Sequence, residues 1–163
     1  MRIEACFWKY LFRKPKDLEI LQKSYIFKNL SCKEIKRVVD YLHKRTYKKD
    51  EVIVAYGEPG FALYIIIEGK VGVEIPTKDG FIEVEELTQG EFFGEIAVIT
   101  DSFRTATVKC KDHTVTYVLT RSGLEHLIEV SPQIAVKILY NIAGVIAERL
   151  KKINEQLKYE VQK

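Results

Sequence analysis

Two short runs carry the strongest pattern in this sequence: Gly90-Glu91-Phe92-Phe93-Gly94-Glu95-Ile96-Ala97-Val98-Ile99, and then Arg104-Thr105-Ala106-Thr107-Val108. Glu95 follows Gly94 at the start of a short turn, and Arg104 comes nine positions later at the start of a β-patterned run. Such a pattern can hold a phosphorylated sugar, because arginine grips phosphate as a fixed charged fork and a carboxylate accepts from a ribose hydroxyl. Main-chain N–H groups at the start of a one-turn helix would complete the anion cradle.

The same two charged residues have a simpler interpretation, because Glu95 and Arg104 could form a salt bridge at the end of a strand. Two small neighbours favour ligand binding instead. Gly94 allows the backbone to approach a ligand closely, and Ala97 keeps the surface of the turn small. The residues alone therefore favour a ligand site and leave the structural pair open.

Both runs resemble the phosphate-binding cassette of the cyclic nucleotide-binding domain family, which includes kinase regulatory subunits, gated ion channels and the bacterial catabolite activator protein. Residues 93–98 are similar to the family's F-G-E-[IL]-A-L, and residues 104–108 to its R-[AST]-A-[TS]-V. Upstream, residues 57–71, with their spaced glycines, resemble the first half of the family pattern, and the likeness covers roughly Tyr25 to Leu157. We call residues 90–108 the cassette.

The resemblance implies a ligand, cyclic AMP or cyclic GMP, and a set of binding residues. The cassette would supply Phe93, Gly94, Glu95, Ile96, Ala97, Arg104 and Thr105, and the purine would lie on Val73, Val84 and Leu87, unless these three are purely core. A hydroxyl directly after the arginine, here Thr105, permits cyclic GMP without requiring it, and it could equally be an ordinary strand threonine. Phe103 departs from the proline that commonly precedes the arginine, so φ is less fixed there.

Composition and charge limit the other classes of function. The chain has 163 residues, enough for one domain with extensions, and a net charge of +3 does not suggest nucleic-acid binding. No apolar run approaches the length of a membrane span. Glu4, Lys9 and Arg13 interrupt the N-terminal apolar stretch, which is therefore no secretory signal. We expect a cytoplasmic protein whose three cysteines, Cys6, Cys32 and Cys110, are idle thiols.

Enzyme activity on a similar barrel would need clustered metal ligands. His43, His113 and His126 are isolated, no H-x-H occurs, and the cysteines form no cluster. We therefore expect no enzyme, no catalytic residue, no metal and no cofactor beyond the nucleotide. A ligand-free scaffold for protein contacts, and a sensor of another small anion, remain as alternatives to a nucleotide sensor.

Periodicity predicts a mainly β fold with flanking helices. Asp17 is expected to cap a short helix, and Ser31 with Glu34 forms a capping box before a second helix whose apolar face runs from Ile35 to Leu42. Strands are expected near 46–48, 52–55, 62–68, 70–76, 81–87, 104–110 and 113–119. That many short strands indicate a closed antiparallel roll or sandwich, which the resemblance narrows to a β-roll (jelly roll). The expected domains are an N-terminal helical extension (1–24), the β-roll (25–130) and a long C-terminal helix (131–163).

The C-terminal helix follows a short helix near 121–129 and begins at Pro132, after Ser131. Its apolar residues form one stripe: Leu139, Ile142, Ile146, Leu150, Ile153, Leu157 and Val161. The upper part should pack on the roll, and the part beyond Arg149 needs a partner, most simply its twin in a two-fold homodimer. By resemblance, Arg149 and Asn154 could contact the base, unless they form a solvated helix face.

The chain ends at Lys163, so we expect no helix-turn-helix domain, no direct binding of nucleic acid, and an output through an effector protein. Residues 3–12 combine large apolar side chains with lysine and arginine. They could dock a partner or lie at a membrane interface, but packing against the chain's own domain or its dimer mate is the simpler interpretation.

Overall fold

A computed structural model of the chain describes residues 15–161. The helices are α1 (Pro15–Lys23), the short 3-10 helix η2 (Tyr25–Phe27), α2 (Cys32–Val39), α3 (Glu95–Ile99), α4 (Arg121–Val130) and α5 (Pro132–Val161). The strands are β1 (Leu42–Tyr47), β2 (Val52–Val54), β3 (Ala62–Glu68), β4 (Val71–Thr77), β5 (Gly80–Leu87), β6 (Phe92–Phe93), β7 (Thr107–Cys110) and β8 (Thr114–Thr120). The N-terminal aromatic-basic segment, for which we predicted packing or docking, lies outside the described residues.

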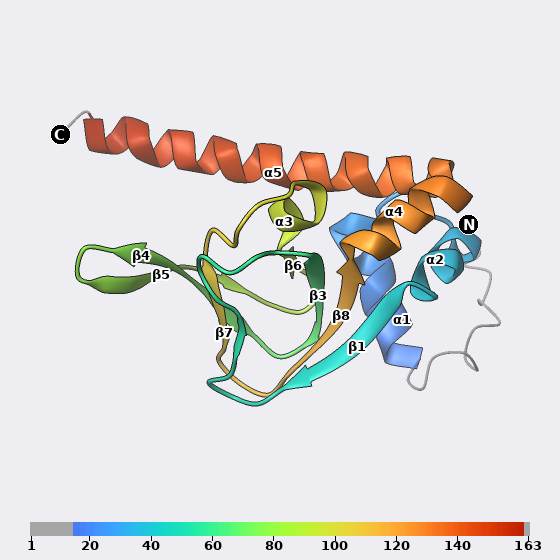
Figure 1. The fold of residues 1–163 in the computed structure, drawn as a ribbon, viewed down its shortest axis with the longest axis horizontal. Coiled ribbons are helices and arrows are strands. Elements are labelled where there is room, and N and C mark those ends of the chain that lie inside the picture. The colour runs from blue at the N-terminus through green and yellow to red at the C-terminus, as the bar shows by residue number, and fades with distance from the viewer. Residues whose placement is uncertain (1–14, 162–163) are drawn as a thin grey trace.

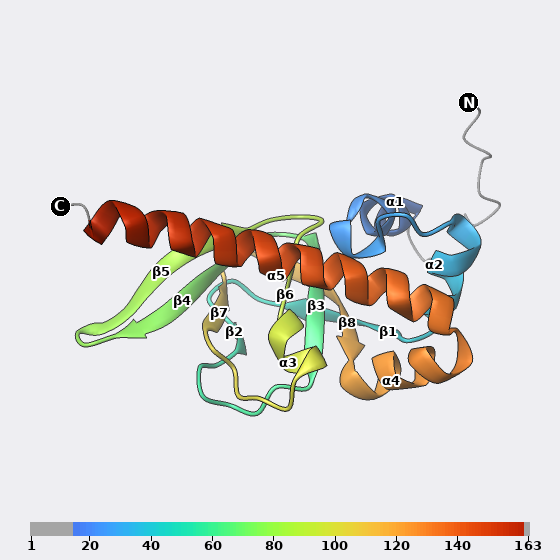
Figure 2. The ribbon, with the colours of Figure 1, turned by 90° about the horizontal axis from the view of Figure 1, so that it is seen from above.

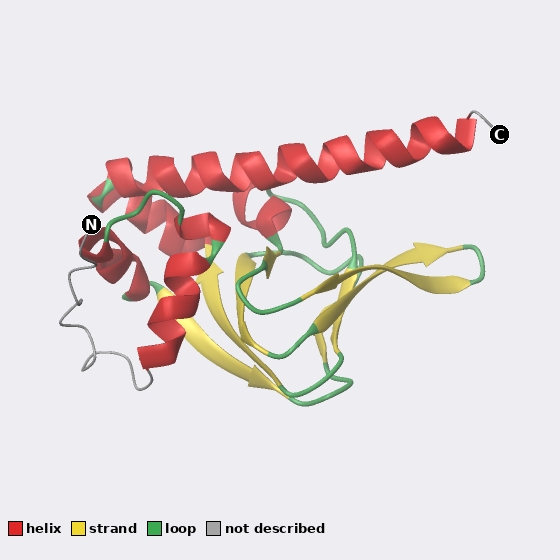
Figure 3. Ribbon diagram, turned by 180° about the vertical axis from the view of Figure 1, so that it is seen from behind, coloured by secondary structure: helices red, strands yellow, loops and turns green. Residues whose placement is uncertain are grey.

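The strands form two four-stranded sheets whose neighbours are all antiparallel. One sheet has the order β1-β8-β3-β6 and the other β2-β7-β4-β5, so strands distant in sequence lie side by side. Figure 3 shows the helices gathered at one end of this roll and along its upper side. The prediction of an antiparallel β-roll with flanking helices and a long C-terminal helix is confirmed.

Two apolar clusters divide the core. The larger one joins the helix-facing side of β3 and β8 to the helices, and its fully buried members include Leu63, Leu119, Leu127, Ile138 and Ile142. The smaller one fills the roll between the two sheets, where Ile66, Val71, Leu87, Phe93 and Val108 meet. The smaller cluster therefore forms the floor beneath the cassette helix α3.

The N-terminal helices match the prediction in kind but differ at their ends. Ser31 accepts from the backbone N–H of Glu34 while the Glu34 carboxylate accepts from the backbone N–H of Ser31, which confirms the capping box. The helix ends at Val39, however, and Leu42 opens strand β1, so the predicted start of that strand at 46 is wrong. The β-sheet pairing of Leu42 with Leu119 outweighs the helical spacing that placed it on α2.

Asp17 lies inside α1 rather than at its cap, because the helix already begins at Pro15. Its buried carboxylate binds the ammonium of Lys44 on β1, and the Tyr117 hydroxyl of β8 donates to it at 3.4 Å. Burial, with the nearby Asp17 charge, raises the pKa of Tyr117 to about 12, so the hydroxyl keeps its proton. These contacts fix α1 against the first sheet.

Helix α5 crosses the whole molecule (Figures 1 and 2). Ile138 and Ile142 in its first half are fully buried, whereas Leu150, Ile153 and Leu157 are each more than half exposed. The prediction that the upper stripe packs on the roll and the lower stripe does not is confirmed. The β4–β5 hairpin projects in the same direction as the second half of α5 (Figure 1).

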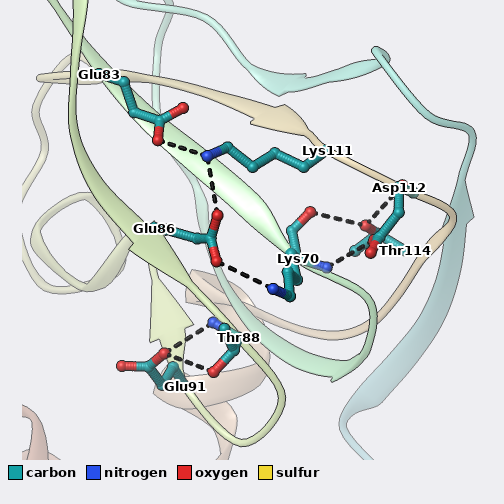
Figure 4. A network of polar contacts seen from close by, with 8 residues as sticks. All are labelled: Lys70, Glu83, Glu86, Thr88, Glu91, Lys111, Asp112 and Thr114. Atoms are coloured by element: carbon teal, nitrogen blue, oxygen red, sulfur yellow. Dashed lines mark hydrogen bonds and ion pairs between the residues drawn. The ribbon is translucent and has the colours of Figure 1, made fainter.

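A charged network on the outer face of the second sheet holds that hairpin to the roll (Figure 4). Lys111 donates to Glu83 at 2.6 Å and to Glu86 at 2.9 Å, and Lys70 reaches Glu86 at 3.3 Å. The Lys111 side chain passes over Gly72, where a Cβ would lie only 2.5 Å from the Glu83 carboxylate. These pairs are exposed, so their main effect is on the placement of β5 rather than on stability.

Two further expectations concern the cysteines and the membrane. Cys110 is a buried free thiol, but Cys32 is disulfide-bonded, so the prediction of idle thiols is wrong at Cys32. Among the helices of residues 15–161, none is both long and apolar enough to cross a bilayer.

Candidate ligand-binding site

A cavity opens between the second sheet, the cassette and the middle of α5. Its lining comes from β2 and β7 (Val54, Val108), from β4 and β5 (Val73, Glu85, Leu87), from the cassette (Phe93, Gly94, Glu95, Ile96, Ala97, Phe103, Arg104, Thr105, Ala106) and from α5 (Arg149). The strand wall is thus apolar apart from Glu85, and the other charged groups are Glu95 and Arg104 of the cassette and Arg149 of α5.

The backbone at Gly94 sets the direction of α3. Gly94 caps the helix with a φ of 83°, a conformation that L residues with a side chain rarely adopt. A Cβ there would also meet the Ala62 carbonyl oxygen and the Arg104 guanidinium, each at 2.7 Å. The turn therefore requires glycine, and it brings the first amides of α3 to the edge of the cavity.

Arg104 is only 7% exposed, yet no carboxylate pairs with it within residues 15–161. Its Nη1 donates to the Ala62 carbonyl at 3.0 Å, and its guanidinium lies 5.6 Å above the Tyr64 ring. Tyr64 in turn stacks on Phe93, with ring centroids 5.0 Å apart. Burial lowers the pKa of the Arg104 guanidinium below its ordinary value, which shows how poorly its charge is solvated.

Glu95 pairs with α5 and not with Arg104. The buried Glu95 carboxylate accepts from Nη1 of Arg149, whose Nη2 also donates to the Phe92 carbonyl at 3.1 Å. Nε of Arg149 lies 3.9 Å from the Glu85 carboxylate. The simpler interpretation of Glu95 and Arg104 as a mutual salt bridge is therefore wrong, because each has a different partner.

Arg149 and Glu85 also line a second cavity between α5 and the roll. That cavity is bounded by η2, the β5–β6 turn and α5: Tyr25, Gly90, Glu91, Phe92, Gly144, Val145, Glu148 and Lys152. The Arg149 side chain and its partners thus form the partition between the two spaces.

The structure brings together every predicted site residue except Val84 and Asn154. Val84 is 53% exposed because side chains alternate along β5, so Val84 faces away from the side that carries Glu85 and the buried Leu87. It is also the extra residue of a bulge, since Val73 pairs with Glu85 and Glu74 with Glu83. Glu85 takes the cavity-facing place instead. Asn154 is exposed and does not line the cavity, because it lies beyond the point where α5 leaves the roll.

Tyr64, Glu85 and the strand residues Val54 and Val108 belong to the site but were not predicted. Tyr64 stood in the upstream run that resembles the family, so a signal for it existed. Strand alternation gave a signal for Glu85 as well, because it stands two residues before the buried Leu87 on β5. A metal centre finds no support in the described part of the chain, where no three histidine, cysteine or acidic side chains gather.

The comparisons with known proteins agree with this geometry. Residues 44–131 match the family model of the cyclic nucleotide-binding domain, and the chain belongs to that family. A cGMP-dependent protein kinase of Drosophila melanogaster is 32% identical over 152 residues, which are 91% of this chain and 16% of the kinase. A cAMP-dependent protein kinase regulatory subunit of Dictyostelium discoideum is 37% identical over 67% of this chain and 35% of its own length.

Two solved structures show the same fold. The catabolite activator protein of Thermus thermophilus superposes with a TM-score of 0.77 at 27% identity, over 85% of this chain and 63% of its own. A cyclic nucleotide-binding domain from Methylobacillus flagellatus gives 0.80 at 23% identity, over 89% and 82%. The chain spans only 16% of the length of the Drosophila kinase and 35% of the length of the Dictyostelium regulatory subunit.

Proposed function

We propose that this chain binds a purine cyclic nucleotide, cyclic AMP or cyclic GMP, in the cassette cavity and acts as a sensor of it. One observation carries the proposal: in a chain of this family, Arg104 is a buried cation at the wall of a cavity and pairs with no carboxylate among residues 15–161. A buried charge that lacks a counter-charge is costly, and a bound phosphate would supply one. The same conclusion is supported by two relatives that are named as a cGMP-dependent protein kinase and as the regulatory subunit of a cAMP-dependent protein kinase.

The proposed pose follows the charges. The cyclic phosphate would meet the Arg104 guanidinium and the first amides of α3. Glu95, whose Oε1 is held by Arg149, would accept from the ribose hydroxyl. The base would lie against Val73 and Leu87, with the exposed hydroxyl of Thr105 available to a guanine amino group.

The proposed output runs through α5. Arg149 donates hydrogen bonds to both Glu95 and the Phe92 carbonyl. A ligand that moves Glu95 would therefore change the position of α5 on the roll. A ligand can shift such an equilibrium only by its difference in affinity for the two arrangements. We propose that the moving helix is read by an effector protein.

We also propose that α5 pairs with the α5 of a second copy, because Leu150, Ile153 and Leu157 form an exposed apolar stripe on a helix that has left its own roll. A cytoplasmic location is proposed from the ligand class alone, since the Cys32 disulfide removes the support that idle thiols would have given.

A second candidate function is a ligand-free scaffold or a sensor of a different anion. Glu95 is already satisfied by Arg149 without any ligand, which a scaffold would also show. A structural neighbour, 25% identical with a TM-score of 0.68, is the regulatory subunit of a cAMP-independent protein kinase A from Trypanosoma brucei.

Titration calorimetry with cyclic AMP and with cyclic GMP tests the proposal, on protein that has been unfolded and refolded to strip carried-over ligand. We expect the wild type to bind one nucleotide with micromolar or tighter affinity. Arg104→Leu should lose about 100-fold or more of that affinity, because charge-assisted bonds to the phosphate are removed. Glu95→Gln should lose less affinity. Arg45→Leu, at an exposed position on β1, is the matched control and should bind like wild type. Absence of heat and of thermal shift with both nucleotides, or unimpaired binding by Arg104→Leu, would reject the proposal in favour of a scaffold or another anion.

A further inference from the structure

Three segments meet at the C-terminal end of α3, opposite to the end that carries Glu95. They are the C-terminal turn of α3 with residues 100–102, the loop before β3 at residues 57–61, and the first turn of α4 at Arg121. Backbone bonds join the first two: the Gly60 N–H donates to the Ser102 carbonyl at 3.2 Å, and Pro59 bridges to Phe103. The third is joined to them by the side chain of Arg121.

The Arg121 guanidinium binds carbonyls at the C-terminal end of α3 and in the loop before β3. Its Nη2 donates to the carbonyl oxygens of Ala97 at 2.6 Å, Gly60 at 3.1 Å and Thr100, and its Nη1 reaches Asp101 at 2.9 Å. The last carbonyls of a helix have no intrahelical donor, and an arginine can bind them. Its side chain is only 20% exposed, and its Nε is buried with no hydrogen-bond partner among the described residues.

The carbonyl of Gly60 links Arg121 to the phosphate side of the cavity. Gly60 packs so tightly that a Cβ on it would lie 2.3 Å from the Ala97 Cβ and 3.0 Å from Nε of Arg104. Arg121 therefore holds the two surfaces, Gly60 and Ala97, that fix the stem of Arg104. The backbone N–H of Arg121 also donates to the Phe61 carbonyl at 2.7 Å, which ties the same residue to the loop a second time.

On its other side Arg121 is the first residue of α4, and α4 packs against both α3 and α5. Any displacement of α3 or of the 57–61 loop must therefore either break the bonds of Arg121 or move the start of α4. This route to α5 is separate from the Arg149–Glu95 contact, which joins α5 to the opposite end of α3.

We infer that Arg121 is a positioning residue: it clamps the cassette around the anion site and transmits the position of α3 through α4 to α5. The clamp itself follows from the contacts above, and its role in signalling rests on the proposed function. Asp101 is a minor partner, because its carboxylate side chain is 90% exposed and such ion pairs contribute little.

The first experiment measures amide hydrogen exchange of the ligand-free protein, so that the clamp is tested whether or not a nucleotide binds. Arg121→Met keeps most of the stem length but removes every donor. We expect exchange in residues 57–61 and 96–103 to become at least about tenfold faster, while β3 and β8 stay as protected as in wild type. Arg45→Met and Asp101→Asn, the controls, should leave both segments unchanged. Unchanged exchange in those segments of Arg121→Met, or faster exchange throughout the chain, would refute the clamp.

The second experiment tests transmission with the nucleotide that wild type binds. Arg121→Met should weaken affinity about tenfold, and at saturating nucleotide it should lose the wild-type change in exchange along α4 and α5. Arg121→Lys, which keeps one cationic donor, should restore part of both. A purely structural arginine would give the wild-type response once the site is filled, and that result would remove the signalling role. If wild type binds neither nucleotide, the proposed function fails and so does this role, whereas the clamp is decided by the first experiment alone.

Discussion

Gly60 is the residue whose size matters most to the anion site. Its Cα faces Ala97 and the Arg104 side chain, and the predicted position of a Cβ at 2.3 Å from the Ala97 Cβ leaves no room for any larger residue. The backbone there is not in the left-handed region, so the constraint is one of packing and not of φ. It follows that the sizes of residues 60 and 97 depend on each other, because both side chains would occupy the same space.

We predict that Gly60→Ala destabilises the protein by about 1–3 kcal/mol, the usual cost of overpacking a well-packed interior. Adding Ala97→Gly should recover part of that loss, because it removes the atom that clashes, although glycine costs roughly 1 kcal/mol of helix propensity in α3. Urea unfolding of wild type, both single variants and the double variant measures the coupling. Strictly additive free energies of unfolding would show that the two side chains do not meet.

Single residues also mark the limit of what the sequence could predict about the site. Glu95 and Arg104 were predicted as a pair, and Arg149 was predicted to reach the site, because all three stand in recognisable motifs. Their actual partners could not be predicted: Glu95 turns to Arg149 and Arg104 to the Ala62 carbonyl. Arg121 gave no signal at all, because an arginine at the start of a helix is usually an ordinary surface residue.

At the scale of elements, α2 and α5 are joined by one carboxylate. Glu34 accepts from the Ser31 backbone N–H at 2.7 Å and from the Lys137 ammonium at 2.7 Å. The hydrogen bond from Lys137, followed by that from Ser31, lowers the pKa of Glu34 from 4.5 to about 2. Since the pKa in the folded state lies below that of the unfolded chain, this contribution to stability is present above the ordinary pKa and is lost as the pH falls toward 2.

We predict that wild type exceeds Glu34→Gln in free energy of unfolding at about pH 6, and that the gap narrows steadily between about pH 5 and pH 2. Glutamine can still complete the capping box, so the comparison isolates the charge. Urea unfolding at a series of pH values measures it. In a Lys137→Met background, the pH-dependent part of this difference in free energy of unfolding should shrink. A difference that stays constant with pH would mean that the fold does not favour the charged form of Glu34.

The same scale explains why most elements, but not all their ends, were predictable. Glycine-separated β-rich runs and the apolar stripe of α5 depend on local patterns, and both are present in the structure. Leu42 was misplaced because its position depends on a distant strand, β8, where it pairs with Leu119. Val84 was misplaced because it lies an odd number of residues from the buried Leu87 and therefore faces the opposite side of β5. Strand β6, at two residues, was too short to give a pattern.

For the whole molecule, the proposed homodimer gives the clearest prediction. In the double variant Ile153→Lys/Leu157→Lys, a dimer would have to bury four lysines where the wild type buries apolar side chains. We therefore expect this variant to be monomeric, with α5 still docked on its own roll. Sedimentation equilibrium of wild type and variant measures this. Tyr140→Lys, at a 77% exposed position on the docked half of α5, is the control and should not change the mass. A wild type that stays monomeric, or a lysine variant that still dimerises, would contradict pairing through this stripe.

The free length of α5 has a mechanical consequence. Between its contacts at Arg149 and its end at Val161 the helix extends about 18 Å, at 1.5 Å per residue, and its residues from Leu150 to Lys158 are exposed on this chain. A tilt of about 10° at Arg149 would swing the far end by roughly 3 Å. A small shift of the cassette would thus be amplified into a displacement at the end of α5 that is comparable to the width of a side-chain contact. The helix would act as a lever arm.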